Sequence, residues 1–254
     1  GVQAAPAELR EFITLATDLA VSDCFSVLPP GAATPEHVAH LTSLNVIATE
    51  TALRDQLNPA TPGSEPEHPD LSEAAQAAGL DEGQTLAAAA VASTDPLVIV
   101  EGAAGSGKTT MLRTAITVTA EHGRASRMVA PTKKAAQVAE EQLGVPATSV
   151  AALVYAHGWR WNRDGVWTRL SHGDLDPDTG RTYTGPPKHA VLSRGMRVIV
   201  DEAGMLDQDT AHALLTVTAE AGATVALVGD RAQLPAVGRG GVLDMAAQIR
   251  GRTY

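Results

Sequence analysis

A glycine-rich stretch of this chain has the residue types and spacing that bind phosphate. An apolar run precedes it and a segment with helical spacing follows it. The residues, in order, are Gly102, Ala103, Ala104, Gly105, Ser106, Gly107, Lys108, Thr109 and Thr110. Backbone N–H groups of such a loop, with the positive end of the next helix, can hold phosphate oxygens. We expect Lys108 to reach the β- and γ-phosphates and the Thr109 hydroxyl to bind Mg²⁺, so the pattern predicts ATP and Mg²⁺ as cofactors.

Two adjacent acids follow a second apolar run. Asp201 and Glu202 come directly after Val198–Val200. Beside a phosphate loop, Asp201 is expected to hold the metal, and Glu202 to polarise the attacking water for hydrolysis. Ordinary surface charge at a strand end is the alternative, and the phosphate loop upstream argues against it.

A lone glutamine, Gln233, follows a third apolar run at residues 224–228. Ligands of parallel sheets lie at the carboxyl ends of the strands, so this position predicts that Gln233 lies beside the γ-phosphate. Its amide can accept from water and donate to a phosphate oxygen. Gln233 is therefore expected to assist catalysis.

Strands and helices alternate around these residues. Strands are expected at 97–100, 128–130, 198–200 and 224–228, and helices at 109–122, 133–143 and 208–221. Alternation of this kind predicts an α/β fold with a parallel sheet and right-handed crossovers.

The N-terminal part of the chain carries no catalytic pattern. Residues 1–57 show helical spacing, and residues 58–70 are acidic and rich in proline, as expected of a linker. We therefore expect a helical segment with its linker at 1–70 and an ATPase domain at 71–254, with a small β-rich insertion at about 155–197.

Charge and cysteine content exclude several classes of protein. The net charge of the 254 residues is −10, but residues 1–90 hold 13 acidic and 2 basic residues and the remainder is nearly balanced. One cysteine excludes a disulfide framework, and no apolar run is long enough to span a bilayer. A cytoplasmic protein with no membrane partner is expected.

Three motifs carry a family resemblance. The phosphate loop resembles Walker A, "VDEAGML" at 200–206 resembles motif II of superfamily 1 helicases, and "GDRAQLPAV" at 229–237 resembles their motif III. The longer stretches around motifs II and III are most similar to RecD-type (superfamily 1B) motors, and in particular to the helicase part of conjugative relaxase-helicases of the actinobacterial type. The resemblance implies a RecA-like P-loop NTPase fold.

Two further stretches fit the same family. "MVAPTKKAAQVAEEQLG" at 128–144 resembles motif Ia, whose threonine contacts a single-strand phosphate and corresponds to Thr132. "GLDEGQTLAAA" at 79–89 resembles the Q motif, whose glutamine reads the adenine edge and corresponds to Gln84. An amide can pair with adenine N6 and N7, although this motif is short and a glutamine without a nucleotide-binding role stays the alternative.

The resemblance implies the nucleotide-binding half of an ATP-dependent DNA helicase or translocase, with single-stranded DNA as partner. Such motors need a second RecA-like domain with motifs IV to VI, which this sequence lacks, so we expect little motor activity from the chain alone. A non-motor ATP-dependent scaffold and another P-loop phosphotransferase, such as a small-molecule kinase, remain alternatives.

The segment at 155–197 interleaves aromatic and basic residues and contains all three tryptophans. In the family, this place holds a small β subdomain that meets DNA, so Trp161, Trp167 and Arg160 are candidate DNA contacts through stacking and charge. The alternative is that the tryptophans form the core of a small β unit. Aspartates at 174, 176 and 178 are spaced as in a calcium loop, but Gly180 falls one position late and Gly185 stands where the bidentate Glu belongs, so a polar turn is predicted.

Overall fold

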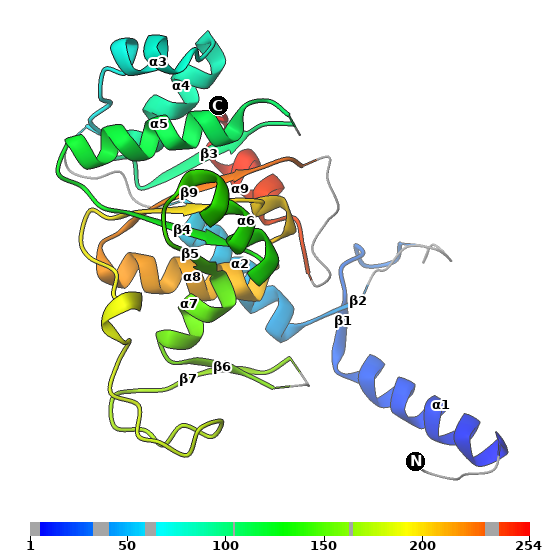
Figure 1. Cartoon of the computed structure of the whole chain (residues 1–254). Coiled ribbons are helices and arrows are strands. Elements are labelled where there is room, and N and C mark those ends of the chain that lie inside the picture. The colour runs from blue at the N-terminus through cyan, green and yellow to red at the C-terminus, as the bar shows by residue number, and fades with distance from the viewer. Residues whose placement is uncertain (1–5, 33–40, 59–64, 104, 163–164, 232–238) are drawn as a thin grey trace. The chain divides into compact units, whose positions relative to one another are not determined.

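The computed structural model describes residues 6–32, 41–58, 65–103, 105–162, 165–231 and 239–254 (Figure 1). The chain divides into two compact units, Gly1–Ala52 and Leu53–Tyr254. Helix α2 (Leu44–Leu57) contains this division. The predicted domain boundary at residue 70 stays a prediction.

The first unit contains α1 (Pro6–Ser22), β1 (Cys24–Ser26), β2 (Leu41–Ser43) and the start of α2. Strands β1 and β2 pair antiparallel, Cys24 opposite Ser43. Helical spacing predicted α1 correctly. It was wrong for Leu41, which lies in β2, because a three-residue strand is too short to produce a period.

A five-stranded parallel sheet forms the centre of the second unit, in the order β3-β9-β8-β4-β5. The strands are β3 (Leu97–Glu101), β4 (Ser126–Ala130), β5 (Ala147–Ser149), β8 (Arg197–Val200) and β9 (Thr224–Gly229). The strand of the phosphate loop is thus separated from the strand of Asp201 by β9. This is the strand order of a RecA-like P-loop NTPase, and the predicted fold class is confirmed.

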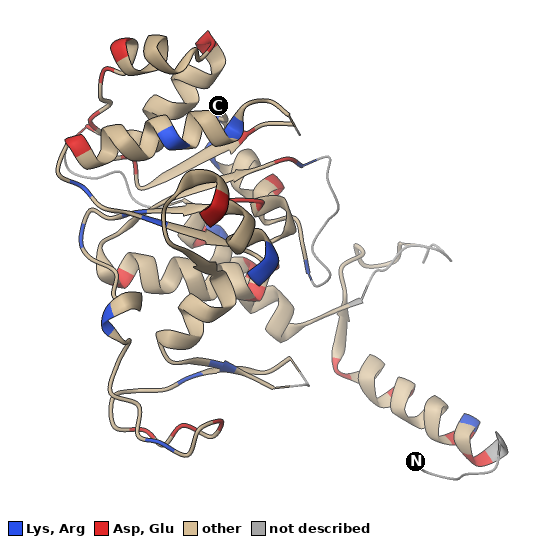
Figure 2. Ribbon diagram, in the orientation of Figure 1, with Lys and Arg blue, Asp and Glu red and all other residues tan. Residues whose placement is uncertain are grey.

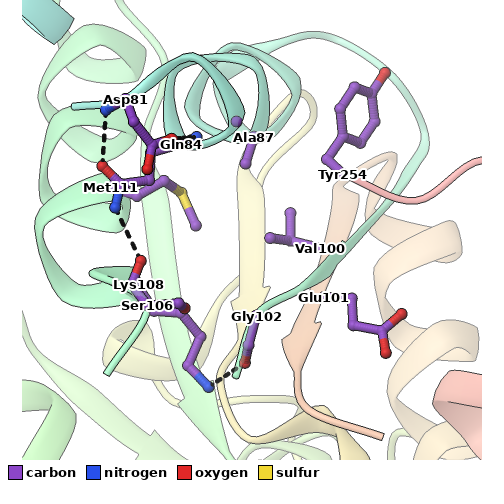
Figure 3. A pocket seen from close by; sticks show the side chains of 11 residues that line it. Asp81, Gln84, Ala87, Val100, Glu101, Gly102, Ser106, Lys108, Met111 and Tyr254 are labelled. Atoms are coloured by element: carbon purple, nitrogen blue, oxygen red, sulfur yellow. Dashed lines mark hydrogen bonds between the residues drawn. The ribbon is translucent and has the colours of Figure 1, made fainter. Parts of the chain in front are cut away.

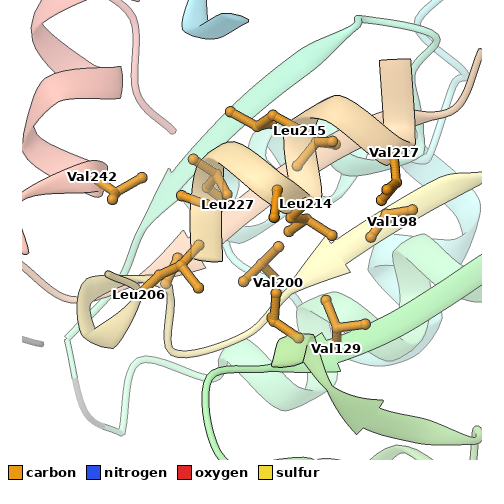
Figure 4. Packing of buried hydrophobic residues seen from close by; sticks show 14 of the residues in the cluster. Val129, Val198, Val200, Leu206, Leu214, Leu215, Val217, Leu227 and Val242 are labelled. Carbon is orange, nitrogen blue, oxygen red and sulfur yellow. The ribbon is translucent and has the colours of Figure 1, made fainter. Parts of the chain in front are cut away.

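Helices cover both faces of the sheet, which is why β3, β8 and β9 contain continuous apolar runs. On one face, α3 (Ser72–Ala78), α4 (Glu82–Ala92), α5 (Lys108–Glu121) and α6 (Lys133–Leu143) pack on one set of strand residues. On the other face lie α7 (Val150–Ala156), α8 (Gln208–Ala221) and α9 (Val242–Arg250). Figure 4 shows Leu214 of α8 close to Val200 and Leu227 in this second core.

A small antiparallel unit lies between α7 and β8. Strand β6 (Trp159–Trp161) pairs with β7 (Trp167–Arg169), and an isolated bridge joins Leu175 to Thr182. The short 3-10 helices η1 (Lys188–Ala190) and η2 (Ala203–Met205) flank β8. Antiparallel pairing is therefore present at two places in this segment.

Candidate nucleotide and metal site

The phosphate loop joins the end of β3 to the start of α5, as predicted. Gly107 caps α5 with φ 78°, a left-handed angle that favours glycine. A Cβ on Gly107 would lie 2.6 Å from Gln84 Nε2, so the loop backbone and α4 approach as closely as glycine allows. Of the predicted loop residues, Ala104 lies outside the described residues.

The Lys108 side chain turns back over the loop (Figure 3). Its Nζ donates to the Gly102 carbonyl oxygen at 2.9 Å. An ammonium has three donors, so this bond leaves others for phosphate oxygens. Binding of the β- and γ-phosphates by Lys108 stays a prediction.

A cavity of about 230 Å³ opens beside the loop. Its walls come from α4, from β3 with the loop, from α5 and from the C-terminal residue (Figure 3). The lining residues are Asp81, Gly83, Gln84, Ala87, Val100, Glu101, Gly102, Ser106, Lys108, Met111 and Tyr254. The mixture of apolar walls and a few polar groups suits a nucleotide base and ribose next to the phosphates.

Gln84 has a structural role at this cavity. Its Oε1 accepts from Asp81 N at 3.0 Å, and Asp81 Oδ1 accepts from Gln84 N at 2.8 Å, which makes a capping box on α4. Its Nε2 donates to the Ser106 carbonyl at 2.9 Å. Gln84 therefore ties the start of α4 to the phosphate loop. The second proton of Nε2 and the second lone pair of Oε1 could still pair with adenine, and this role stays a prediction.

The acidic pair lies at the carboxyl end of β8. Asp201 Oδ1 accepts from the Glu202 backbone N at 3.0 Å, and Asp201 N donates to Val129 O of β4. Burial raises the pKa of Asp201, the neighbouring Glu202 charge raises it further, and Lys108 opposes both. Lys108 therefore lies near enough to Asp201 for its charge to lower the pKa of the carboxyl, and a shared site for the phosphate loop and the acidic pair stays a prediction.

The donor atoms fit Mg²⁺, which prefers oxygen ligands. Thr109 offers a hydroxyl and Asp201 a carboxylate. Two adjacent carboxylates with one of them largely buried leave negative charge that a divalent cation would neutralise. Thr109 and Asp201 would hold the ion.

Glu202 has φ 54°, and among the described residues it is the non-glycine residue with a positive φ. The left-handed region costs an L-residue of order 1 kcal/mol or more. Strain of this kind at a strand end that also carries the acidic pair is typical of functional residues.

Backbone contacts join the acidic loop to the chain after β9. A Cβ on Gly204 would lie 2.7 Å from the Asp230 carbonyl oxygen, and a Cβ on Gly229 would lie 2.9 Å from Gly204 N. Arg231 forms an ion pair with Glu101 at the end of β3. Gln233 itself lies outside the described residues, so its predicted place beside the γ-phosphate stays a prediction.

Two residues of this region escaped prediction. Gln142 Oε1 accepts from the Thr109 hydroxyl at 3.2 Å. Tyr254 lines the cavity because its backbone pairs with β3, with Tyr254 N donating to Ile99 O at 3.0 Å and Glu101 N donating to Tyr254 O at 2.8 Å. Neither has a local sequence signal, because both contacts join segments that are distant in the chain.

A family described as "AAA domain" matches residues 79–253 of this chain. The chain belongs to this AAA-domain family. It therefore contains a P-loop nucleotide-binding domain, and the finer helicase assignment is a matter for the next subsection.

Two solved structures are similar to part of this AAA domain. A complex of Arterivirus nonstructural protein 10 (helicase) with DNA is 20% identical, with a TM-score of 0.35, over 65% of this chain and 36% of that one. A crystal structure of the same Arterivirus helicase is 22% identical, with a TM-score of 0.33, over 66% of this chain and 35% of that one. The chain thus spans about a third of the length of these structures.

Thr132 begins α6 of the AAA domain as its N-cap. Its side chain accepts from Ala135 N at 3.1 Å, and Lys133 and Lys134 occupy the first turn. Figure 2 shows basic residues at one end of α6 and acidic residues at the other. The N-terminal end of a helix carries partial positive charge, so Lys133 and Lys134 are placed unfavourably there. An anion bound at this end would compensate for the repulsion. Contact with DNA remains a prediction for Thr132.

Arg160 lies inside the small β unit of the AAA domain and is 5% exposed. Its Nε and one terminal nitrogen donate to both oxygens of Asp176, at 3.0 and 2.8 Å. The other terminal nitrogen donates to the Tyr155 and Trp159 carbonyls, and the guanidinium lies 3.6 Å from the centre of the Tyr155 ring. Since the guanidinium is used within the unit, this placement favours a structural role over the predicted DNA contact.

The tryptophans form a stack that reaches outward from the core. Trp159 and Trp167 pack against the large core and meet edge to face at 6.1 Å. Trp161 stacks on Trp167 at 4.8 Å and is 41% exposed. The alternative of a small aromatic core therefore fits Trp159 and Trp167, whereas Trp161 keeps an exposed surface that a partner could contact.

Asp176 pairs with Arg160 and belongs to a polar turn, as predicted.

Among the described residues, no helix combines the length and the apolar character that crossing a membrane requires.

Proposed function

We propose that this AAA domain is the nucleotide-binding half of an ATP-dependent DNA helicase or translocase of the RecD type, and that it couples ATP hydrolysis to movement on single-stranded DNA. The observation that carries the proposal is the arrangement around β9. This strand lies between β3, which leads into the phosphate loop, and β8, which leads into the acidic pair. In the chain that leaves β9, Arg231 pairs with Glu101 at the end of β3, and the Asp230 carbonyl lies against Gly204 after β8. Within this proposal, the resemblance of motifs II and III points to the relaxase-helicase group.

Each residue of the site then has a physical task. The loop amides and Lys108 bind the β- and γ-phosphates, and Thr109 with Asp201 holds Mg²⁺. When bound, the ion neutralises charge on the phosphate oxygens. Glu202 orients a water molecule and accepts its proton as the water attacks the γ-phosphorus. Gln233 reports the presence of the γ-phosphate through its amide.

Single-stranded DNA and a second RecA-like domain are the proposed partners at this edge of the sheet. Thr132 with Lys133 and Lys134 offers donors and positive charge to a phosphate of single-stranded DNA. A second RecA-like domain, in the proposal, supplies the arginine that stabilises the transferring phosphoryl group, an effect of roughly 10³–10⁵ in rate. Nucleotide binding is expected without that domain, and efficient turnover is not.

Calorimetry and single-turnover hydrolysis test the nucleotide site. Lys108→Ala should abolish measurable binding of Mg-ADP, because the side-chain cation at the β-phosphate is lost. Glu202→Gln should keep nearly the wild-type affinity and lose hydrolysis, because only activation of water is removed. Equal affinity of wild type and Lys108→Ala would contradict the site.

Fluorescence anisotropy with a labelled oligothymidine tests the DNA part. Thr132→Ala combined with Lys133→Ala should weaken binding at low salt, and binding should change between Mg-ADP and a non-hydrolysable Mg-ATP analogue. A chain that binds nucleotide but never DNA would favour the scaffold or phosphotransferase alternatives. Transfer of the γ-phosphate to a small-molecule acceptor would identify the latter.

A further inference from the structure

The hydroxyl of the metal-binding threonine has a partner on another helix. Thr109 lies in the first turn of α5, and its Oγ1 donates to Oε1 of Gln142 at 3.2 Å. Gln142 lies in the last turn of α6. The contact joins residues 33 positions apart. Gln142 lies within the stretch 128–144 that resembles motif Ia, but the resemblance assigns it no role.

A hydroxyl has one proton and two lone pairs. A metal ion binds through a lone pair, so the proton must point elsewhere. When the proton is committed to Gln142 Oε1, the lone pairs of Thr109 Oγ1 are turned away from α6. Groups that hold a metal ligand in this way often change metal affinity by 10–100-fold when they are replaced.

The end of α6 is held in place independently of this amide. The Arg113 guanidinium of α5 donates to the backbone oxygen of Gln142. Ala139 and Leu143 of α6 are buried in the core, at 3% and 8% exposure. Gly144 ends the helix in the left-handed conformation, with its N–H bonded to Glu140 O. The Gln142 side chain can therefore be changed while the backbone of the helix end stays where it is.

We propose that Gln142 is a positioning residue for Mg²⁺: it fixes the rotamer and the proton of the Thr109 hydroxyl so that a lone pair faces the ion. The inference rests on the proposed nucleotide function. It adds that the metal affinity of the site depends on the C-terminal turn of α6, a segment outside the phosphate loop and outside the acidic pair.

The test is the Mg²⁺ dependence of ADP binding, measured by calorimetry with and without Mg²⁺, together with direct Mn²⁺ binding followed by electron paramagnetic resonance. Gln142→Leu should bind metal-free ADP like wild type and should lose about tenfold in Mn²⁺ affinity at the ADP-bound site. Gln142→Glu retains an acceptor oxygen for the hydroxyl and should restore metal binding.

Gln137→Leu is the matched control. Gln137 is an exposed residue of the same helix, and its Nε2 donates to Glu141 rather than to α5. This variant should bind the metal like wild type. Equal Mn²⁺ affinity of Gln142→Leu and Gln137→Leu would overturn the inference, whereas a wild type that binds neither ADP nor Mn²⁺ would instead reject the proposed nucleotide site. A second outcome would also contradict the inference: Gln142→Leu melts at a lower temperature, Gln142→Glu does not, and both keep the wild-type Mn²⁺ affinity. The contact would then be purely structural.

Discussion

Asp201 illustrates the conflict between function and stability at the scale of one residue. Its carboxylate is largely buried next to Glu202, and both effects raise its pKa. A raised pKa means that the folded state binds the proton more tightly than the unfolded state does. The charged form therefore costs folding free energy near neutral pH, and that cost disappears as the pH falls through the raised pKa.

The first prediction follows from this sign. Asp201→Asn should raise the melting temperature at neutral pH and lose Mg²⁺-dependent ADP affinity, because the amide removes the buried charge and a metal ligand together. The gain should shrink as the pH is lowered, since wild-type Asp201 then takes up a proton. Thermal melts at several pH values check it, and an Asn variant that is less stable than wild type at neutral pH would contradict the account.

Gly204 sets how closely two loops approach. Its missing Cβ allows the Asp230 carbonyl to lie against it. Gly204→Ala should push the chain after β9 away from the acidic loop. We expect near-wild-type affinity for Mg-ADP but a smaller difference between Mg-ADP and a non-hydrolysable Mg-ATP analogue, because the γ-phosphate is no longer sensed jointly by the two loops. Calorimetry with both nucleotides measures the difference, and an unchanged ratio of affinities would show that the contact has no such role.

At the scale of elements, the small β unit separates two uses of tryptophan. Trp159 packs on the core, whereas Trp161 is 41% exposed at the outer end of the stack. Trp159→Ala should lower the melting temperature markedly, since truncation of a packed aromatic costs about 3–5 kcal/mol. Trp161→Ala should leave the melting temperature nearly unchanged and weaken oligothymidine binding by about 1–3 kcal/mol. If Trp161→Ala melts early and still binds DNA like wild type, all three tryptophans are structural.

The sequence predicted elements well wherever a period or a motif was long enough to detect. The apolar runs of β3, β8 and β9 were readable because they depend on neighbours within a few residues. The β1–β2 hairpin was missed because its strands have three residues each. The pairing of Arg160 with Asp176 was missed for another reason. The charge pattern predicts that the arginine is available for DNA, and only the folded structure shows that it pairs with an aspartate 16 residues away.

At the scale of the whole molecule, the candidate site is built from segments far apart in the chain. The sequence shows their order along the chain but not the contacts between them. The motifs predicted that Lys108, Asp201 and Glu202 would meet at one edge of the sheet, and the electrostatic influence of Lys108 on Asp201 agrees with this. The contribution of Gln142, the ion pair of Arg231 with Glu101 and the backbone of Tyr254 beside β3 depend on how helices and chain ends pack. These contacts have no periodicity, so only the three-dimensional structure reveals them.

The strand order also has a consequence for how the chain folds during its synthesis. Among the described strands of the five-stranded sheet, β9 is the partner of β3, and more than a hundred residues separate them along the chain. A ribosome adds about 5–20 residues each second, so β3 leaves it several seconds before its partner exists. Until then, the apolar run Leu97–Val100 has no neighbouring strand and is a segment on which chaperones can act. The phosphate loop at the end of β3 thus gains its framework among the last parts of the domain, and nucleotide binding reports that folding is nearly complete.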